Sequence, residues 1–168
     1  MYKYIICFLV IVSIQVGAME RFSAQELLQY AQRYVEAKNK LQQINSAEQD
    51  INNYLALLSS DIKIETVFPD MEPVLTRKNE LKDQMFRALG NEYDYSEMNI
   101  QESMVGLNSI ILKVTEKSKH KGIVSFLDEH KYIRKIGPDR FIEGEITFVI
   151  TLQLDQRGLI EFMSIRLG

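Results

Sequence analysis

The stretch that decides the fold is FIEGEITFVITLQLDQRGLIEFMSIRL, residues 141–167. Its first half, Phe141–Leu154, alternates apolar and polar residues with a period of two, as expected for a β-strand with one buried face. The next four residues, Asp155–Gly158, suit a turn whose glycine can adopt positive φ. Residues Leu159–Leu167 then return as a second strand. The sequence therefore predicts a long β-hairpin at this end of the chain.

Period-two alternation continues upstream of the hairpin. It predicts strands at Met98–Met104 and Ser109–Lys117, separated by a turn at residues 106–108. The polar segment Asn91–Ser96 is expected to be a turn, and the lysine-rich segment Lys117–Gly122 a hairpin tip. Residues 123–136 do not favour one element. These strands and the hairpin together indicate an antiparallel meander.

The first half of the chain has helical periodicity instead. Ser23 and Glu26 fit a capping box, and Ser46 with Gln49 repeats the pattern. The spacing of apolar residues alternates between three and four in two stripes, which are Leu27, Tyr30, Tyr34, Ala37, Leu41 and Ile44, then Ala47, Ile51, Tyr54, Leu55 and Leu58. Two helices are predicted; a single coiled-coil helix over Leu27–Leu58 is the alternative.

A strand and a third helix are predicted between these two halves. Asp61–Phe68 alternates and is rich in β-branched residues, and Pro69 ends it. Thr76 is the predicted cap of a helix that stops at Gly90. Helices that precede most of the strands indicate an α+β fold rather than a parallel α/β fold.

The first 18 residues have the pattern of a cleavable export signal. Lys3 precedes an apolar run, Tyr4–Val12, and the segment ends in small or modest-sized residues at Val16–Ala18. The run is shorter than the roughly 20 apolar residues that span a bilayer. We expect residues 1–18 to be a signal peptide and residues 19–168 to form one domain without a membrane span. The protein is then bacterial and either periplasmic or secreted.

Charge and cysteine content exclude several classes of protein. The 168 residues carry a formal charge of −3, which becomes −4 once Lys3 leaves with the signal peptide. Because nucleic-acid binding needs a basic surface, no nucleic-acid partner is expected. The single cysteine, Cys7, lies in the signal segment, so the domain has no disulfide or thiol nucleophile. His120 and His130 have no further ligands at metal-binding spacing, and we expect neither a metal nor a cofactor.

The order of elements resembles the SnoaL-like branch of the nuclear-transport-factor-2-like superfamily. The resemblance extends from about Gln25 to Leu167. It is carried by Arg33-Tyr34-Val35-Glu36, by Ile62-Lys63-Ile64-Glu65 with the following proline loop and Leu81–Leu89, and by Leu154-Asp155-Gln156-Arg157-Gly158-Leu159-Ile160. It implies a conical α+β barrel, with N-terminal helices packed in the concave face of a curved, mainly antiparallel sheet.

The resemblance also implies a homodimer formed through the sheet. Val149 interrupts the polar face of the long strand, and Met163, Ile165 and Leu167 share one face of the last strand. Sheet faces of mixed polarity can pack on a second copy of the chain.

The resemblance places the catalytic groups of the family's isomerases at unsuitable residues. The general base falls on Thr66–Phe68 and the second acid near Ile150. A threonine is a poor base, and an isoleucine donates no proton. The family's tyrosine matches Tyr34, and Asp70 is the nearest acid that can replace the base. A solvated turn residue is the simpler interpretation of Asp70.

Large side chains on the inner side of such a cone are candidates for ligand binding. Tyrosine hydroxyls on the first helices can point into a cavity or serve as core aromatics with a satisfied hydroxyl. Met85, Met98, Met104 and Met163 can line a soft apolar cavity or belong to the plain core. The predicted ligand-binding residues are Tyr30, Tyr34, Tyr54, Phe68, Phe86, Phe148 and Ile150.

These features predict an exported protein that holds a small hydrophobic ligand in an apolar pocket. A cyclase or hydrolyase that uses Tyr34 with Asp70 as an acid–base pair is the first alternative. A structural or interaction protein, with a filled cavity and a sheet that docks a partner, is the second. Tyr34→Phe and Asp70→Asn would abolish turnover in an enzyme and leave a binding protein folded.

Overall fold

The computed structural model describes residues 22–69, 72–89, 93–121, 133–136 and 141–167, and the predicted signal peptide lies outside them. The helices are α1 (Ala24–Leu41), α2 (Glu48–Ala56) and α3 (Lys78–Ala88). The strands are β1 (Leu58–Val67), β2 (Val74–Arg77), β3 (Tyr93–Val105), β4 (Ser109–Lys121), β5 (Ile133–Ile136), β6 (Phe141–Leu154) and β7 (Ile160–Leu167). The predicted α+β class is confirmed. No helix in the described part is both long and apolar enough to cross a bilayer.

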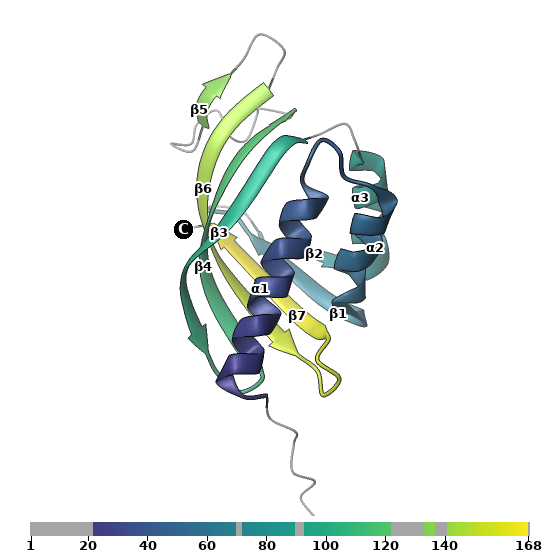
Figure 1. Cartoon of the computed structure of the whole chain (residues 1–168), viewed down its shortest axis with the longest axis vertical. Coiled ribbons are helices and arrows are strands. Elements are labelled where there is room, and N and C mark those ends of the chain that lie inside the picture. The colour runs from purple at the N-terminus through teal and green to yellow at the C-terminus, as the bar shows by residue number, and fades with distance from the viewer. Residues whose placement is uncertain (1–21, 70–71, 90–92, 122–132, 137–140, 168) are drawn as a thin grey trace, which may run out of the picture.

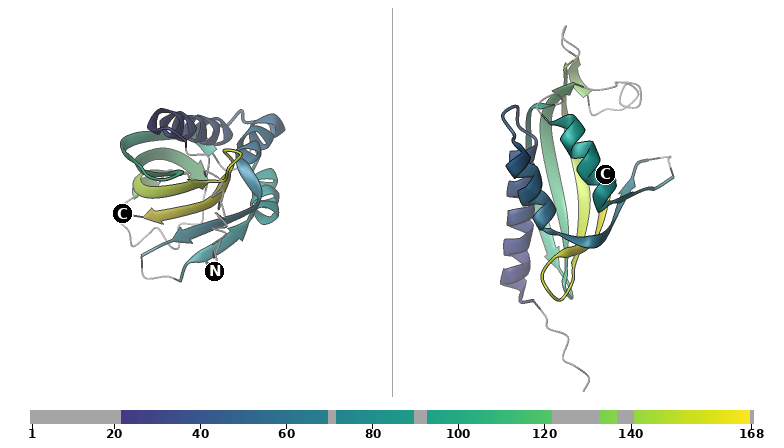
Figure 2. Two further views of the ribbon diagram at one scale, coloured as in Figure 1. Left: turned by 90° about the horizontal axis from the view of Figure 1, so that it is seen from below. Right: turned by 90° about the vertical axis from the view of Figure 1, so that its right-hand side faces the viewer.

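A single sheet contains all of these strands. Their order is β2-β1-β7-β6-β4-β3, and β5 pairs with β6 outside this path. Neighbours are antiparallel except β1 and β7, which run parallel. The sheet curls around α1, α2 packs beside α1, and α3 lies beside α2 (Figures 1 and 2). Within the described residues, β2 and β3 are free edges, so the cone is open rather than a closed barrel.

The core lies between α1 and the inner face of the sheet. Ser23 and Glu26 form the predicted capping box at the start of α1, with hydrogen bonds of 2.8 and 3.2 Å between side chain and backbone. The buried apolar side chains of α1, β4, β6 and β7 include Leu27, Ala31, Tyr34, Val35, Ile110, Leu112, Val114, Ile150, Leu152, Leu154 and Met163. The predicted apolar faces of the first helix and of the long strand are therefore the ones that meet.

The turn of the C-terminal hairpin forms as predicted. The Asp155 carboxylate accepts hydrogen bonds from the backbone amides of Arg157 and Leu159 at 2.8 and 3.0 Å. Gly158 adopts φ 78°, and a Cβ atom there would lie 2.2 Å from Tyr30 Oη. Both the conformation and the close approach of the α1 side chain require glycine at this position.

The first helices are separated, but their boundary differs from the prediction. The chain between Leu41 and Glu48 is not helical, which excludes one continuous coiled-coil helix. Ser46 does not cap α2. The cap is Ala47, whose amide donates to the Asp50 carboxylate at 2.9 Å. The acidic side chain three residues into the helix replaces the serine as the capping group.

Three segments predicted as turns or caps belong to strands. Thr76 does not cap α3; it pairs with Ile64 in the short edge strand β2. Residues 93–96 pair with residues 118–120 of β4, so Lys117–Lys121 of the lysine-rich segment lies in a strand and not in a hairpin tip. An ion pair of 2.7 Å joins Asp94 and Lys119 across these strands. Opposite charges facing each other explain how so polar a segment forms a sheet.

The inner face of β7 also differs from one expectation. Met163 is buried next to Tyr34, and Ile165 and Leu167 line a cavity between α1 and the sheet. The prediction that these three residues pack on a second copy is therefore wrong, because the strand turns them toward α1.

Side chains in the last turn of α1 and directly after it hold the edge strand β3 in place. Asn39 Nδ2 donates to the Met98 carbonyl at 3.0 Å, and Asn39 Oδ1 accepts from the Met98 amide at 2.7 Å. Gln43 Nε2 donates to the Ser96 carbonyl at 2.7 Å. Because β3 pairs with β4 on one side only, its other backbone groups need partners. The helix supplies them, which fixes the last turn of α1 against the sheet.

Candidate ligand-binding cavity

A cavity of about 260 Å³ lies between the C-terminal half of α1 and the inner face of the sheet. Its lining is mostly apolar and comprises Tyr34, Lys38, Gln42, Thr66, Phe68, Met98, Glu116, Ser118, Ile146, Phe148, Ile150, Ile165 and Leu167. Pockets for drug-sized molecules typically measure about 300–1,000 Å³. This cavity is slightly smaller, so it suits a ligand below drug size.

Four of the predicted ligand-binding residues come together in this cavity. Phe68 follows β1, Phe148 and Ile150 lie on β6, and Tyr34 projects from α1. Thr66, where the resemblance places the general base, lines the same cavity. Neither Thr66 nor Ile150 supplies the acid–base chemistry of an isomerase.

The other predicted ligand-binding residues lie outside this lining. Tyr30 packs next to Gly158 in the hairpin turn. Tyr54 is buried behind Tyr34, with ring centroids 6.0 Å apart. Phe86 is half-buried on α3 and packs against the core.

Tyr34 is a buried hydroxyl that stays protonated. Its oxygen lies 3.6 Å from Met163 Sδ. Burial raises the pKa of Tyr34 well above its ordinary value, and the neighbouring Tyr54 hydroxyl raises it further. Burial also raises the pKa of Tyr54 to about 12. Tyr34 can therefore donate a hydrogen bond but does not act as a base near neutral pH. Asp70 lies outside the described residues, so its pairing with Tyr34 stays a prediction.

Polar side chains form a cluster at one end of the cavity, and we call Lys38, Gln42, Ser96 and Glu116 the polar cluster. Glu116 Oε1 accepts from Ser96 Oγ at 2.7 Å and from Gln42 Nε2 at 3.5 Å. Burial lowers the pKa of Lys38, and attraction to the Glu116 carboxylate opposes this effect. The residue as a whole is half-buried, because part of its side chain remains exposed while its charged end is desolvated.

The sequence prediction missed the polar cluster. Lys38 and Gln42 continue the stripe of Tyr34 at intervals of four residues, which places all three on one face of α1. That spacing is the signal that could have identified them. Glu116 lies 74 residues after Gln42 and joins them only through the fold.

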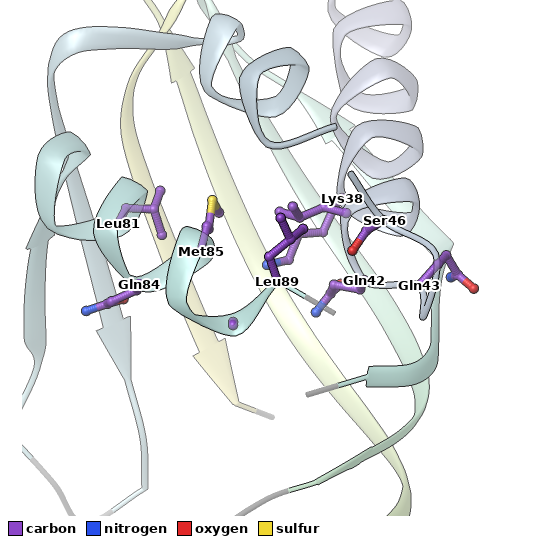
Figure 3. Close-up of a pocket in the computed structure, with 10 residues that line it drawn as sticks. Lys38, Gln42, Gln43, Ser46, Leu81, Gln84, Met85 and Leu89 are labelled. Carbon is purple, nitrogen blue, oxygen red and sulfur yellow. The ribbon is translucent and has the colours of Figure 1, made fainter. Parts of the chain in front are cut away.

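A second cavity of about 350 Å³ adjoins the first, between the C-terminal end of α1 and α3. Lys38 and Gln42 line both cavities and so form their common boundary. Figure 3 shows Leu81, Met85 and Leu89 on the α3 side of this second cavity, across from Lys38 and Gln42. The polar cluster is thus reached from two apolar spaces.

Comparison with known proteins identifies the fold. No protein-family model and no curated protein matches the sequence. AusH from Aspergillus nidulans matches with 18% identity over 87% of this chain and 86% of that chain, at a TM-score of 0.61. An LEH-like epoxide hydrolase from M. tuberculosis matches with 12% identity, coverage of 86% and 84%, and a TM-score of 0.55. BvnE pinacolase from Penicillium brevicompactum matches with 9% identity, coverage of 93% and 89%, and a TM-score of 0.58.

At these identities the likeness concerns the fold alone. The matches cover 86%, 84% and 89% of these three structures, so they concern the whole fold and not one part of it. The resemblance inferred from the sequence is confirmed at this level: the chain has the fold of the nuclear-transport-factor-2-like superfamily, as found in its SnoaL-like proteins.

Proposed function

We propose that this chain is an exported protein that binds a small, largely apolar molecule in the cavity between α1 and the sheet. The observation that carries the proposal is a cavity of about 260 Å³ with a mostly apolar lining and a polar cluster at one end. An apolar ligand gains free energy by leaving water for such a space, and a few polar groups orient it. The fold also occurs in an epoxide hydrolase and a pinacolase.

Export rests on the amino-terminal sequence. Cleavage after Ala18 would leave a chain that starts at Met19 in the periplasm or outside the cell. The intact mass of the protein purified from the exporting cell tests this directly. A chain that retains residues 1–18 after export would overturn the assignment.

Native mass spectrometry of the same preparation tests the binding function. We expect the folded protein to carry the additional mass of a small organic molecule, which is lost on denaturation. Thr66→Phe fills the cavity and should abolish the additional mass. Thr115→Phe is the matched control, because Thr115 lies on β4 at a position that faces away from the buried Val114 and is absent from the cavity lining.

Both variants must first show cooperative thermal unfolding, so that loss of the ligand is not loss of the fold. A bound mass that survives Thr66→Phe would place the ligand elsewhere on the protein. A wild-type protein that carries no additional mass and takes up no added aromatic hydrocarbon would contradict the binding function. It would favour a filled core and a role in protein contact.

Turnover of the bound molecule is the competing function. The buried Tyr34 hydroxyl and the Lys38 ammonium are two of the proton donors that line this cavity. If the bound molecule is converted by the wild-type protein and not by Tyr34→Phe, the chain is an enzyme. If Tyr34→Phe binds the molecule and neither protein converts it, the chain is a binding protein.

A homodimer through the outer face of the sheet accompanies the proposal. Met104 and Ile111 are cross-strand partners on β3 and β4, and their side chains are 67% and 41% exposed. A second copy would cover this apolar pair. Sedimentation velocity should show a dimer that Ile111→Glu dissociates, and a monomer at all micromolar concentrations would exclude it.

A further inference from the structure

The side-chain oxygen of Gln42 accepts no hydrogen bond from the described residues. The residue caps the C-terminal end of α1 and is only 5% exposed. Its Oε1 is the buried side-chain atom that lacks a partner among the described residues. Buried polar atoms are normally paired, so an unpaired one next to two cavities indicates where a ligand binds.

The orientation of the Gln42 amide is fixed by its surroundings. Nε2 lies 3.5 Å from Glu116 Oε1, which also accepts from Ser96 Oγ. Rotating the amide by 180° would place its carbonyl oxygen against the carboxylate oxygen, which is repulsive. The donor end of Gln42 therefore faces Glu116, and the acceptor end is left for another donor.

Lys38 supplies a donor close to this acceptor. Lys38 precedes Gln42 by four residues, and the backbone amide of Gln42 donates to the backbone carbonyl of Lys38. The two side chains therefore lie on the same face of the last turn. The Lys38 ammonium lies over the Tyr54 ring, 5.7 Å from its centroid, and has no ion pair within the described part of the chain. Residues Lys38 and Gln42 thus bring a donor and an acceptor to the boundary of both cavities.

We propose that the ligand is an apolar molecule with a hydroxyl group that donates to Gln42 Oε1 and accepts from Lys38 Nζ. This inference rests on the proposed function, because it names the class of molecule that the cavity holds. A carboxylate ligand has no proton to donate to Gln42, and the Glu116 carboxylate repels it. An ammonium ligand is repelled by the Lys38 ammonium. A hydrocarbon leaves Gln42 Oε1 unpaired. A neutral hydroxyl satisfies both groups at once.

The test compares three probes of nearly the same shape: naphthalene, 1-naphthol and 1-methoxynaphthalene. The ether keeps the acceptor oxygen and lacks the O–H donor, so the difference between it and 1-naphthol isolates donation to Gln42. Because the chain has no tryptophan, the fluorescence of each probe can be titrated without interference from an indole. We expect 1-naphthol to bind the wild-type protein about tenfold more tightly than the ether, the effect of one hydrogen bond. Naphthalene lacks both hydrogen bonds and should bind no more tightly than the ether.

Gln42→Met removes the acceptor and keeps the length of the side chain. It should weaken 1-naphthol to the affinity of the ether and leave naphthalene unchanged. Gln32→Met is the control, because Gln32 is exposed on the same helix. The three-probe comparison in the wild-type protein stands even if Gln42→Met does not fold.

Three outcomes overturn the inference. Equal binding of all three probes would show an open apolar cavity without recognition of a hydroxyl, and the proposed function would stand alone. An ether that binds as tightly as 1-naphthol would show that donation to Gln42 contributes nothing. If no probe binds, the proposed function fails together with the inference.

Discussion

The contact between Asn39 and β3 should contribute strongly to the free energy of unfolding. Asn39→Leu keeps the approximate volume of the side chain and removes both hydrogen bonds to Met98, at 3.0 and 2.7 Å. Met98 is 3% exposed, and β4 pairs with the other side of its strand. In the Asn39→Leu variant, the backbone amide and carbonyl of Met98 would have no other partner among the described residues.

The magnitude follows from the two backbone groups. A buried polar group left unpaired costs about 1–3 kcal/mol, so two cost roughly 2–6 kcal/mol. Water can reach an edge strand in part, which favours the lower half of that range. We expect Asn39→Leu to lower the free energy of unfolding by about 2–4 kcal/mol, a large fraction of the stability of an ordinary domain. Asn39→Asp should cost at least as much, because a carboxylate oxygen would then face the Met98 carbonyl oxygen.

Urea unfolding at pH 7, followed by far-UV circular dichroism, measures these changes. The midpoint should fall while the dependence on urea concentration stays constant, as expected for a loss of stability without a change in the unfolded state. Asn52→Leu is the control, since Asn52 is exposed on α2 and its replacement should change stability by less than about 0.5 kcal/mol. If Asn39→Leu costs no more than this control, the side chain of Asn39 does not hold β3, and the described contact is wrong.

Three further predictions concern the turn, the first cap and the buried tyrosines. Gly158→Ala should lower the free energy of unfolding by about 1–3 kcal/mol, because φ 78° strains alanine and Tyr30 Oη fills the space; an unchanged melting temperature would contradict the close approach. Ser23→Ala should cost about 0.5–2 kcal/mol in urea unfolding and Ser23→Asn much less, and equal losses would show that the cap is unimportant. Burial raises the pKa of Tyr34 and takes that of Tyr54 to about 12, whereas unfolded tyrosines ionise near about 10. Their contribution to stability is therefore complete below pH 10 and falls as the pH rises toward 12, a slope that Tyr34→Phe should reduce and that stability measurements at pH 9 and pH 11 will detect.

The elements with regular apolar periodicity were the ones that the sequence predicted correctly. The bounds of β6 match the predicted strand, and the cap of α1 is the predicted Ser23. In both elements one face packs on the core and the other faces solvent. The spacing of apolar residues along the sequence therefore predicts which face is buried. The fold class followed from these two elements and from the strand at β1.

Strand ends and edge strands were missed for a physical reason. Residues 93–96 and 117–121 are rich in polar side chains, and cross-strand pairing, the contact of Gln43 with Ser96 and the ion pair of Asp94 with Lys119 hold them in the sheet. Three of the four residues of the short strand β2 are exposed, and its pairing depends on β1. Neither segment shows an apolar period, so only their partners in the sheet determine their conformation.

The polar cluster illustrates how far a sequence can determine a site. The inward stripe of α1 passes from Tyr34 to Lys38 and Gln42, and the inward stripe of β4 passes from Val114 to Glu116. In the sequence, each of these polar residues marks only the point where an apolar stripe ends. Such an end is common, because a helix or strand becomes polar where it leaves the core. The fold sets these two ends against each other, where Gln42 and Glu116 each lower the cost of burying the other. Within the described residues this compensation leaves Gln42 Oε1 unpaired, and the hydroxyl group of the proposed ligand would supply the missing donor.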